Sequence, residues 1–106
     1  MNDKKVKIEV QHFEGCPNSS EMIVRVKAAI KEFGNQIDYK EVLVESSEEA
    51  DLVKFRGSPT VLINGIDLEN MPEPKAGNLA CRYYKNGLPS VERIKSLIAD
   101  QSKKEE

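Results

Sequence analysis

Cys16 is the residue of this sequence best placed to do chemistry, because a helix is predicted to begin beside it. In the stretch Cys16-Pro17-Asn18-Ser19 a proline follows the cysteine directly, and proline is tolerated in the first turn of a helix. The unpaired N–H groups and the dipole of a helix N-terminus stabilise a thiolate and lower the pKa of the thiol. The sequence therefore predicts a nucleophilic sulfur, and the alternative is a small side chain that is simply buried.

Ser19 stands where a second cysteine would complete a dithiol motif. One helical turn carries its hydroxyl back toward Cys16, where it could donate a hydrogen bond to the thiolate but could not form a disulfide. A mixed disulfide on Cys16 would then be released by an outside thiol or by Cys81. Direct pairing of the two cysteines is not favoured, because a hairpin that starts at Pro59 would leave Cys81 about 13 Å away along the sheet. For Cys81 we expect a buried position in a strand, with a resolving thiol as the alternative.

Two further residues could belong to a site around Cys16. His12 lies four positions upstream, where an imidazolium could stabilise a thiolate, and the alternative is a half-exposed residue at a strand end. Pro59 begins a predicted strand, where its missing N–H costs nothing, and Gly57 and Ser58 let the chain turn just before it. Considered alone, Pro59 is an ordinary trans proline.

Four strands are expected from alternating or continuous apolar residues, at 5–13, 36–45, 59–64 and 80–84. The continuous run Val42-Leu43-Val44 predicts that the second strand lies inside the sheet. Between the third and fourth strands, residues 65–79 are expected to form a long polar loop. Such a loop could cover the site as a lid or shift the register of the strand that follows.

Three helices are expected from apolar stripes at spacings of three and four, at residues 17–33, 46–55 and 90–99. The stripe of the first comprises Ile23, Val26, Ile30 and Phe33, and that of the third comprises Val91, Ile94, Leu97 and Ile98. Ser46 and Ser90 are the expected caps of the second and third helices. The buried side of the second helix is predicted to comprise Leu52, Val53 and Phe55. The element order is typical of an α/β fold that closes with an antiparallel hairpin.

The composition of the chain excludes several classes of partner. The 106 residues are 39% hydrophobic, which suits one core and one domain. The net charge is −2, with 16 basic and 18 acidic side chains interspersed, so neither nucleic acid nor a membrane is an expected partner. Two cysteines and one histidine are too few for a closed zinc site within one chain. We therefore expect a cytoplasmic monomer without a metal or other cofactor.

Two motifs in this order resemble the thioredoxin-like superfamily: the Cys-x-x-Ser at 16–19, and Gly57-Ser58-Pro59-Thr60 at the start of the next-to-last strand. The resemblance extends from about residue 6 to residue 99. It implies an α/β, thioredoxin-like fold in which a central mixed four-stranded sheet is flanked by helices. The domain is expected over residues 1–101, and residues 102–106 are expected to be a disordered tail.

The resemblance also implies how the site is built. In that family the proline is cis and lies against the active-site sulfur, so Pro59 is expected to face Cys16. The residues expected to bind the substrate are Pro17, Ser58, Pro59 and Thr60, with Ser58 offering its backbone groups. More closely, the sequence is similar to small uncharacterised thioredoxin-like proteins that are sometimes labelled as related to alkylmercury lyase.

Two functions of different classes are consistent with these features. The first is a thiol–disulfide redox protein of the monothiol type, in which Cys16 attacks, Ser19 assists and Cys81 resolves. Its substrate would be a protein or small molecule that contains a thiol or a disulfide. The second is a non-enzymatic module that binds a peptide or a soft metal ion through Cys16.

Overall fold

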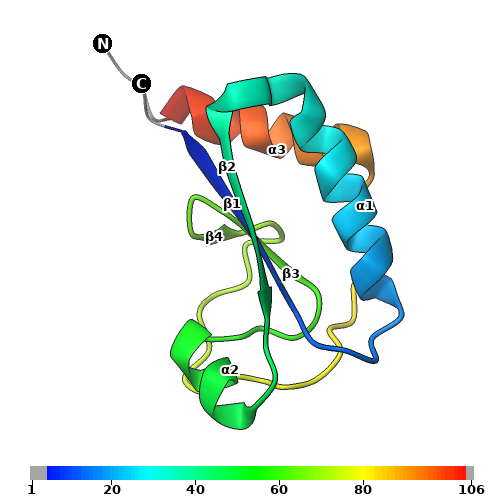
Figure 1. Ribbon diagram of the computed structural model, residues 1–106, viewed down its shortest axis with the longest axis vertical. Coiled ribbons are helices and arrows are strands. Elements are labelled where there is room, and N and C mark those ends of the chain that lie inside the picture. Colours follow the sequence, from blue (N-terminus) through cyan, green and yellow to red (C-terminus); the bar gives the residue numbers. More distant parts are fainter. Residues whose placement is uncertain (1–4, 105–106) are drawn as a thin grey trace.

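A mixed four-stranded sheet flanked by helices forms the framework of the protein, and the computed structural model describes residues 5–104 (Figure 1). The strands lie in the order β2-β1-β3-β4 across the sheet. In chain order the elements are β1 (Val6–His12), α1 (Asn18–Ile30), the 3-10 helix η1 (Lys31–Gln36), β2 (Ile37–Leu43), α2 (Ser47–Val53), β3 (Thr60–Ile63), β4 (Ile66–Asp67) and α3 (Val91–Lys104). This order confirms the predicted α/β class.

β1 is a central strand, and it carries the chain toward Cys16. Its residues Val6, Ile8 and Val10 are buried, as their alternation predicts. β1 pairs in parallel with β2 along its whole length and antiparallel with β3. In the second pairing Gln11 lies opposite Thr60. The start of β3, directly after Pro59, is therefore beside the end of β1 from which the chain continues to Cys16.

The main core lies between the sheet and the two long helices, α1 and α3, which pack against each other (Figure 1). In α1 the fully buried positions are Met22, Val26 and Ala29, whereas the predicted stripe residue Ile23 is only partly buried. The stripe is thus rotated by one residue from its predicted position. In α3 the pattern is as predicted, and the Ser90 hydroxyl accepts a hydrogen bond from the amide of Arg93 at 3.1 Å.

The prediction that the second strand lies inside the sheet is wrong, because β2 is an edge strand. Only part of the apolar run at its end is buried. Val44, which follows β2, is buried in a small separate cluster with Phe55 and with Ala50 of α2. Leu43 is 39% exposed, as an edge strand allows.

The fourth strand lies at Ile66–Asp67 and not at 80–84, where it was predicted. β3 and β4 are joined by the two residues Asn64 and Gly65, with φ of 53° and 82°. Positive φ at both positions is typical of the tight hairpin turn that matches the twist of the strands. The hairpin therefore closes within the segment that was expected to be a loop.

α2 begins as predicted, but it presents a different face to the core. The Ser46 side chain caps the helix by accepting from the amide of Glu49 at 3.1 Å. Ala50 and Phe55 are buried, whereas Leu52 is 82% exposed, so the prediction for Leu52 is wrong. The helix has only seven residues, and it contributes Ala50 to the cluster with Val44 and Phe55.

α3 continues to Lys104, so residues 102–104 of the predicted tail are helical. Residues 105–106 of that predicted tail lie outside the described residues. Within residues 5–104, no helix combines the length and the apolar character that crossing a membrane requires.

Candidate functional site

The two cysteines of the chain are joined to each other. Cys16 and Cys81 form a disulfide with 5.6 Å between their Cα atoms, within the usual range for such a bond. The expectation that Cys81 lies too far along the sheet is wrong because no hairpin connects it to Pro59. Instead, Cys81 forms an isolated parallel bridge with Ser58, one residue before that proline. Cys81 is also exposed, not buried as expected.

Cys16 precedes the first turn of α1, as the sequence predicted. Pro17 is the N-cap residue, and no side chain caps the helix. The backbone carbonyl of Cys16 accepts a hydrogen bond from the amide of Ser19 at 3.2 Å. The cysteine is only 7% exposed, whereas Pro17 is exposed. The sulfur therefore belongs to a buried residue at a helix start whose first amides have no side-chain cap.

Ser19 contacts the second motif and not the sulfur. Its hydroxyl lies 2.7 Å from the hydroxyl of Ser58, and both residues are buried. The Ser58 hydroxyl also accepts a hydrogen bond from the amide of Phe13 at 3.1 Å. Within the part of the chain that the structure describes, no hydrogen bond joins Ser19 to the Cys16 sulfur. This pair of serines instead ties the start of α1 to the segment before β3.

Ser58 and Pro59 lie at the centre of the site. The peptide bond between them is cis, and Thr60 donates through its hydroxyl to the carbonyl of Gly57 at 2.5 Å. The amide of Ser58 donates to the carbonyl of Ala80, and its carbonyl accepts from the amide of Arg82, both at 2.8 Å. The backbone groups that Ser58 was expected to offer to a substrate are therefore used by the chain's own Cys81 segment.

His12 lies at the end of β1, where it is partly exposed and pairs with Leu43. Its carbonyl accepts a hydrogen bond from the amide of Val44 at 2.7 Å. Among residues 5–104, no hydrogen bond or ion pair of its ring connects it to Cys16. The structure thus favours the alternative of a half-exposed residue at a strand end.

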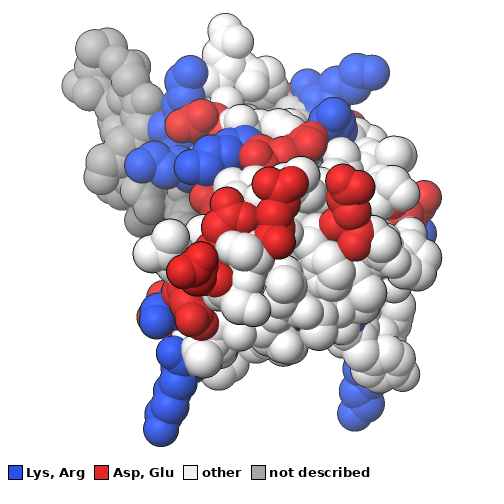
Figure 2. Space-filling model, turned by 60° about the horizontal axis from the view of Figure 1, so that its bottom comes forward, with Lys and Arg blue, Asp and Glu red and all other residues white. Residues whose placement is uncertain are grey.

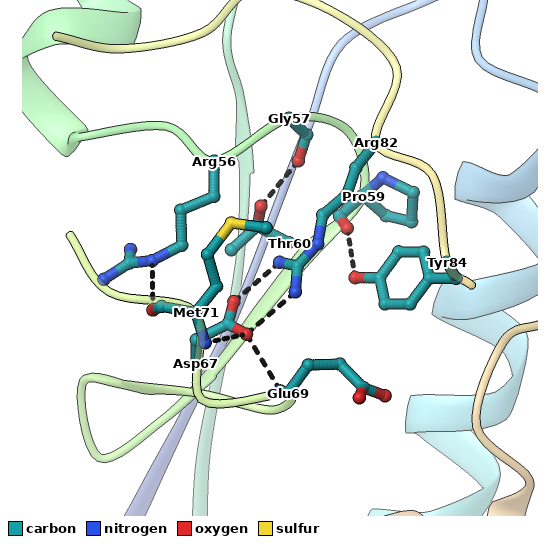
Figure 3. A network of polar contacts seen from close by, with 9 residues as sticks. All are labelled: Arg56, Gly57, Pro59, Thr60, Asp67, Glu69, Met71, Arg82 and Tyr84. Carbon is teal, nitrogen blue, oxygen red and sulfur yellow. Dashed lines mark hydrogen bonds and ion pairs between the residues drawn. The ribbon is translucent and has the colours of Figure 1, made fainter. Parts of the chain in front are cut away.

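A buried polar network around Arg82, the residue after Cys81, was not predicted from the sequence (Figure 3). Arg82 forms two hydrogen bonds with the carboxylate of Asp67, at 2.6 and 2.8 Å. Its guanidinium lies 4.7 Å from the ring centre of Tyr84. The hydroxyl of Tyr84 in turn donates to the carbonyl of Pro59 at 2.5 Å. Arg82 and Tyr84 are buried while Cys81 and Tyr83 are exposed, and a buried arginine next to an exposed cysteine is not signalled by the residue types.

The network fixes the charges of its members. Burial alone would raise the pKa of Asp67, but the hydrogen bonds from Arg82 and from the amides of Met71 and Glu69 outweigh it and hold the pKa below its ordinary value. Burial also acts to lower the pKa of the Arg82 guanidinium, and the hydrogen bonds to Asp67 more than offset it. Burial raises the pKa of the Tyr84 phenol. Asp67 is therefore a carboxylate, Arg82 a cation and Tyr84 a neutral donor.

A shallow cavity of about 260 Å³ is lined by residues of the segments that lead to the two cysteines, and neither cysteine is part of its lining. Its lining includes Phe13, whose amide binds Ser58, and Leu79, two residues before Cys81. Two acidic side chains, Glu14 and Glu45, also line it. The α2 end of the molecule, turned forward in Figure 2, carries acidic side chains across its middle and basic side chains toward its margins. The segments that lead to the two cysteines thus place both apolar and acidic side chains around this cavity.

Metal ligands are sparse around these cysteines. Over the described residues, no group of three or more histidine, cysteine, aspartate or glutamate side chains is arranged to hold a metal ion.

Known structures share this fold at low sequence identity. An uncharacterised thioredoxin-like protein from Clostridium perfringens, solved in solution, is 19% identical with a TM-score of 0.58; the match covers 93% of this chain and 72% of that one. The zinc-bound form of human ERp44 is 20% identical with a TM-score of 0.55, over 93% of this chain but only 27% of ERp44. No protein-family model matches the sequence, and no curated protein matches it significantly. The likenesses show a thioredoxin-like fold.

Proposed function

We propose that this thioredoxin-like chain is a thiol–disulfide redox protein in which Cys16 and Cys81 form a reversible pair. One observation carries the proposal: a buried cysteine at an uncapped helix start is joined to an exposed cysteine from a distant segment. The Cys-x-x-Ser motif then needs no second cysteine of its own, because Cys81 supplies it. The expected monothiol route becomes a route with two cysteines.

Exposure and leaving-group chemistry indicate which sulfur a substrate meets. Cys81 is exposed and Cys16 is 7% exposed, so an incoming thiolate reaches Cys81 more readily. The thiol with the lower pKa leaves faster in such an exchange, and the helix N-terminus lowers the pKa of Cys16. Both arguments favour attack at Cys81 with Cys16 as the leaving thiolate.

The full exchange transfers two electrons and two protons. A dithiol substrate attacks Cys81, the Cys16–Cys81 bond breaks and a mixed disulfide forms. The second thiol of the substrate then attacks the substrate sulfur of the mixed disulfide and releases Cys81. The products are the substrate disulfide and a protein with two thiols. In the opposite direction Cys81 attacks a substrate disulfide, and the Cys16 thiolate attacks Cys81 in the mixed disulfide and expels the reduced substrate.

The acidic and apolar surroundings indicate the kind of substrate. Glu14 and Glu45 disfavour an anionic partner in the cavity that they line, and the lining at Phe13 and Leu79 accepts an apolar group. A cationic or neutral segment of a protein, or a small cationic thiol, is therefore a better substrate than an acidic one.

Trapping of the mixed disulfide tests the proposal. Reduced wild type, Cys16→Ser and Cys81→Ser are each mixed with cystamine, a small cationic disulfide, and followed by mass spectrometry. Cys16→Ser should accumulate a stable cysteamine adduct on Cys81, because it lacks the internal nucleophile. Wild type should pass through that adduct to the Cys16–Cys81 disulfide. Ser20→Ala, which keeps both cysteines and changes an exposed side chain, is the control and should behave as wild type.

Two results would overturn this proposal. In the first, wild type keeps a stable adduct and never closes the internal disulfide. In the second, the transient adduct of wild type is on Cys16, which would reverse the roles of the two sulfurs. A protein that stays reduced and instead binds a soft metal ion through Cys16 would support the alternative of a binding module.

A further inference from the structure

The segment that carries Cys81 is held in place by contacts that do not involve its sulfur. On the backbone, Cys81 lies between Ala80 and Arg82, the two residues that bond to Ser58 at 2.8 Å. Upstream, the amide of Asn78 donates to the carbonyl of Phe55 at 2.8 Å. These bonds fix the chain on both sides of the cysteine, but a backbone bridge one residue long is weak by itself.

The strongest of the anchoring contacts is the ion pair of the next residue. The side chains of Arg82 and Asp67 are 4% and 0% exposed, and their two hydrogen bonds are parallel and bidentate (Figure 3). Asp67 also accepts the amides of Glu69 and Met71, at 2.8 and 3.1 Å. Because Asp67 belongs to β4 and these two amides follow it closely in the chain, the carboxylate is fixed to the sheet. Charge-assisted bidentate bonds of this kind restrict geometry as well as contributing energy.

Gly57 allows Arg82 to lie close to the segment that precedes Pro59. A Cβ atom on Gly57 would lie 2.9 Å from the Cβ of Arg82, so the absence of a side chain at Gly57 makes the contact possible. Tyr84 adds its ring against the guanidinium and its hydroxyl bond to Pro59. Arg82 and Tyr84, which follow Cys81, thus both contact the segment that contains Pro59.

We infer that Asp67 and Arg82 are positioning residues that hold Cys81 opposite Cys16 when the disulfide is reduced, and thereby set the equilibrium between the dithiol and the disulfide. This inference rests on the proposed function, since it concerns the same pair of cysteines. The ion pair does not touch the substrate. It acts by keeping one thiol at a fixed distance from the other, which raises the effective concentration of the reacting groups.

The inference predicts a change in an equilibrium constant, which a merely structural residue would not cause. Wild type and Asp67→Asn are equilibrated in mixtures of reduced and oxidised dithiothreitol, and the dithiol and disulfide forms are quantified by thiol trapping and mass spectrometry. Loss of the bidentate bonds should lower the ratio of disulfide to dithiol about tenfold or more. Arg82→Lys, which keeps the charge but not the paired bonds, should give an intermediate value.

Ile94→Val is the matched control. Ile94 is fully buried in the main core and is not among the residues of the polar network, so its shortening weakens the fold without loosening Cys81. Its ratio should stay within about twofold of wild type, because a mutation that destabilises both redox forms equally leaves their equilibrium unchanged. Circular dichroism establishes which variants are folded. If Asp67→Asn does not fold, the ratio of disulfide to dithiol in Arg82→Lys, compared with wild type, tests the inference instead.

The failure of this inference and the failure of the proposed function give different results. A wild-type protein that forms no internal disulfide in any of these mixtures contradicts the proposed function. A wild type that forms it, beside a folded Asp67→Asn or Arg82→Lys with an unchanged ratio, contradicts only the positioning role. A lowered ratio in Ile94→Val as large as that in Asp67→Asn would likewise overturn it.

Discussion

Removal of the disulfide should have a large effect on stability, and its size follows from the sequence separation of the cysteines. Cys16 and Cys81 are 65 residues apart. A crosslink over a loop of that length restricts the unfolded chain and stabilises the folded state by about 4 kcal/mol in the chain-entropy model. Cys81→Ser should therefore be less stable than the oxidised wild type by about that amount, since serine is tolerated at an exposed position.

The assay is urea denaturation of both proteins, each with and without a reductant, supported by thermal unfolding. Without reductant the two free energies of unfolding should differ by about 4 kcal/mol, which corresponds to a shift in Tm on the order of 15 °C for a domain of this size. With reductant the wild type should fall to the level of Cys81→Ser. The variant itself should not respond to the reductant.

A thermodynamic cycle provides an independent value for the same quantity. The stability gained on oxidation equals the free-energy difference between forming the disulfide in the folded and in the unfolded protein. About 4 kcal/mol corresponds to a ratio of about a thousand between those two equilibrium constants. A wild type whose stability changes by less than about 1 kcal/mol on reduction would refute the reasoning, and so would a variant that reductant destabilises.

Three further predictions concern the surroundings of the pair. Gly57→Ala should lower the free energy of unfolding by more than about 1 kcal/mol in urea titrations, because φ is +104° and the new Cβ meets Arg82; an unchanged midpoint would contradict the close approach. The pKa of Asp67 is held below its ordinary 3.8, so its contribution should be present above that pH and lost as pH falls through the folded-state pKa. The difference in stability between wild type and Asp67→Asn should thus shrink on acidification, and a constant difference down to the acid transition would contradict this. Stopped-flow exchange should be faster with cysteamine than with mercaptopropionate at equal thiolate concentration, because Glu14 and Glu45 repel the anion, and added salt should reduce the difference; equal rates in low salt would contradict it.

The fold could be predicted largely from the sequence because its strands and helices have clear periodicity. The alternation in β1 and the cap at Ser46 are local signals, and local contacts confirm both. The location of the fourth strand was wrong because Asn64-Gly65 is a strong signal for a two-residue hairpin, whereas Asn64 was assigned to the third strand and Gly65 to a loop. β4 has only two residues, too few to show a pattern of their own.

The chemistry at Cys16 was foreseen in part, whereas its partner was not. The start of α1 follows from Pro17 and the apolar stripe after it, which are local features. The position of Cys81 depends on its bridge to Ser58 and on the ion pair between Arg82 and Asp67. These are contacts between distant segments, and no spacing in the sequence indicates them. Because residues 80–84 were assigned to the fourth strand of a hairpin, the sulfur of Cys81 was expected about four residues too far along the sheet.

The central claim is that the amides at the start of α1 hold Cys16 as a thiolate when the pair is reduced. The most direct test is the pH dependence of iodoacetamide labelling in the reduced single-cysteine variants, read by mass spectrometry. Cys16 in Cys81→Ser should be labelled with a pH midpoint well below about 8.5, the value for a free thiol, and Cys81 in Cys16→Ser should be labelled near it. Slow labelling of both cysteines with the same midpoint, near that of a free thiol, would contradict the account.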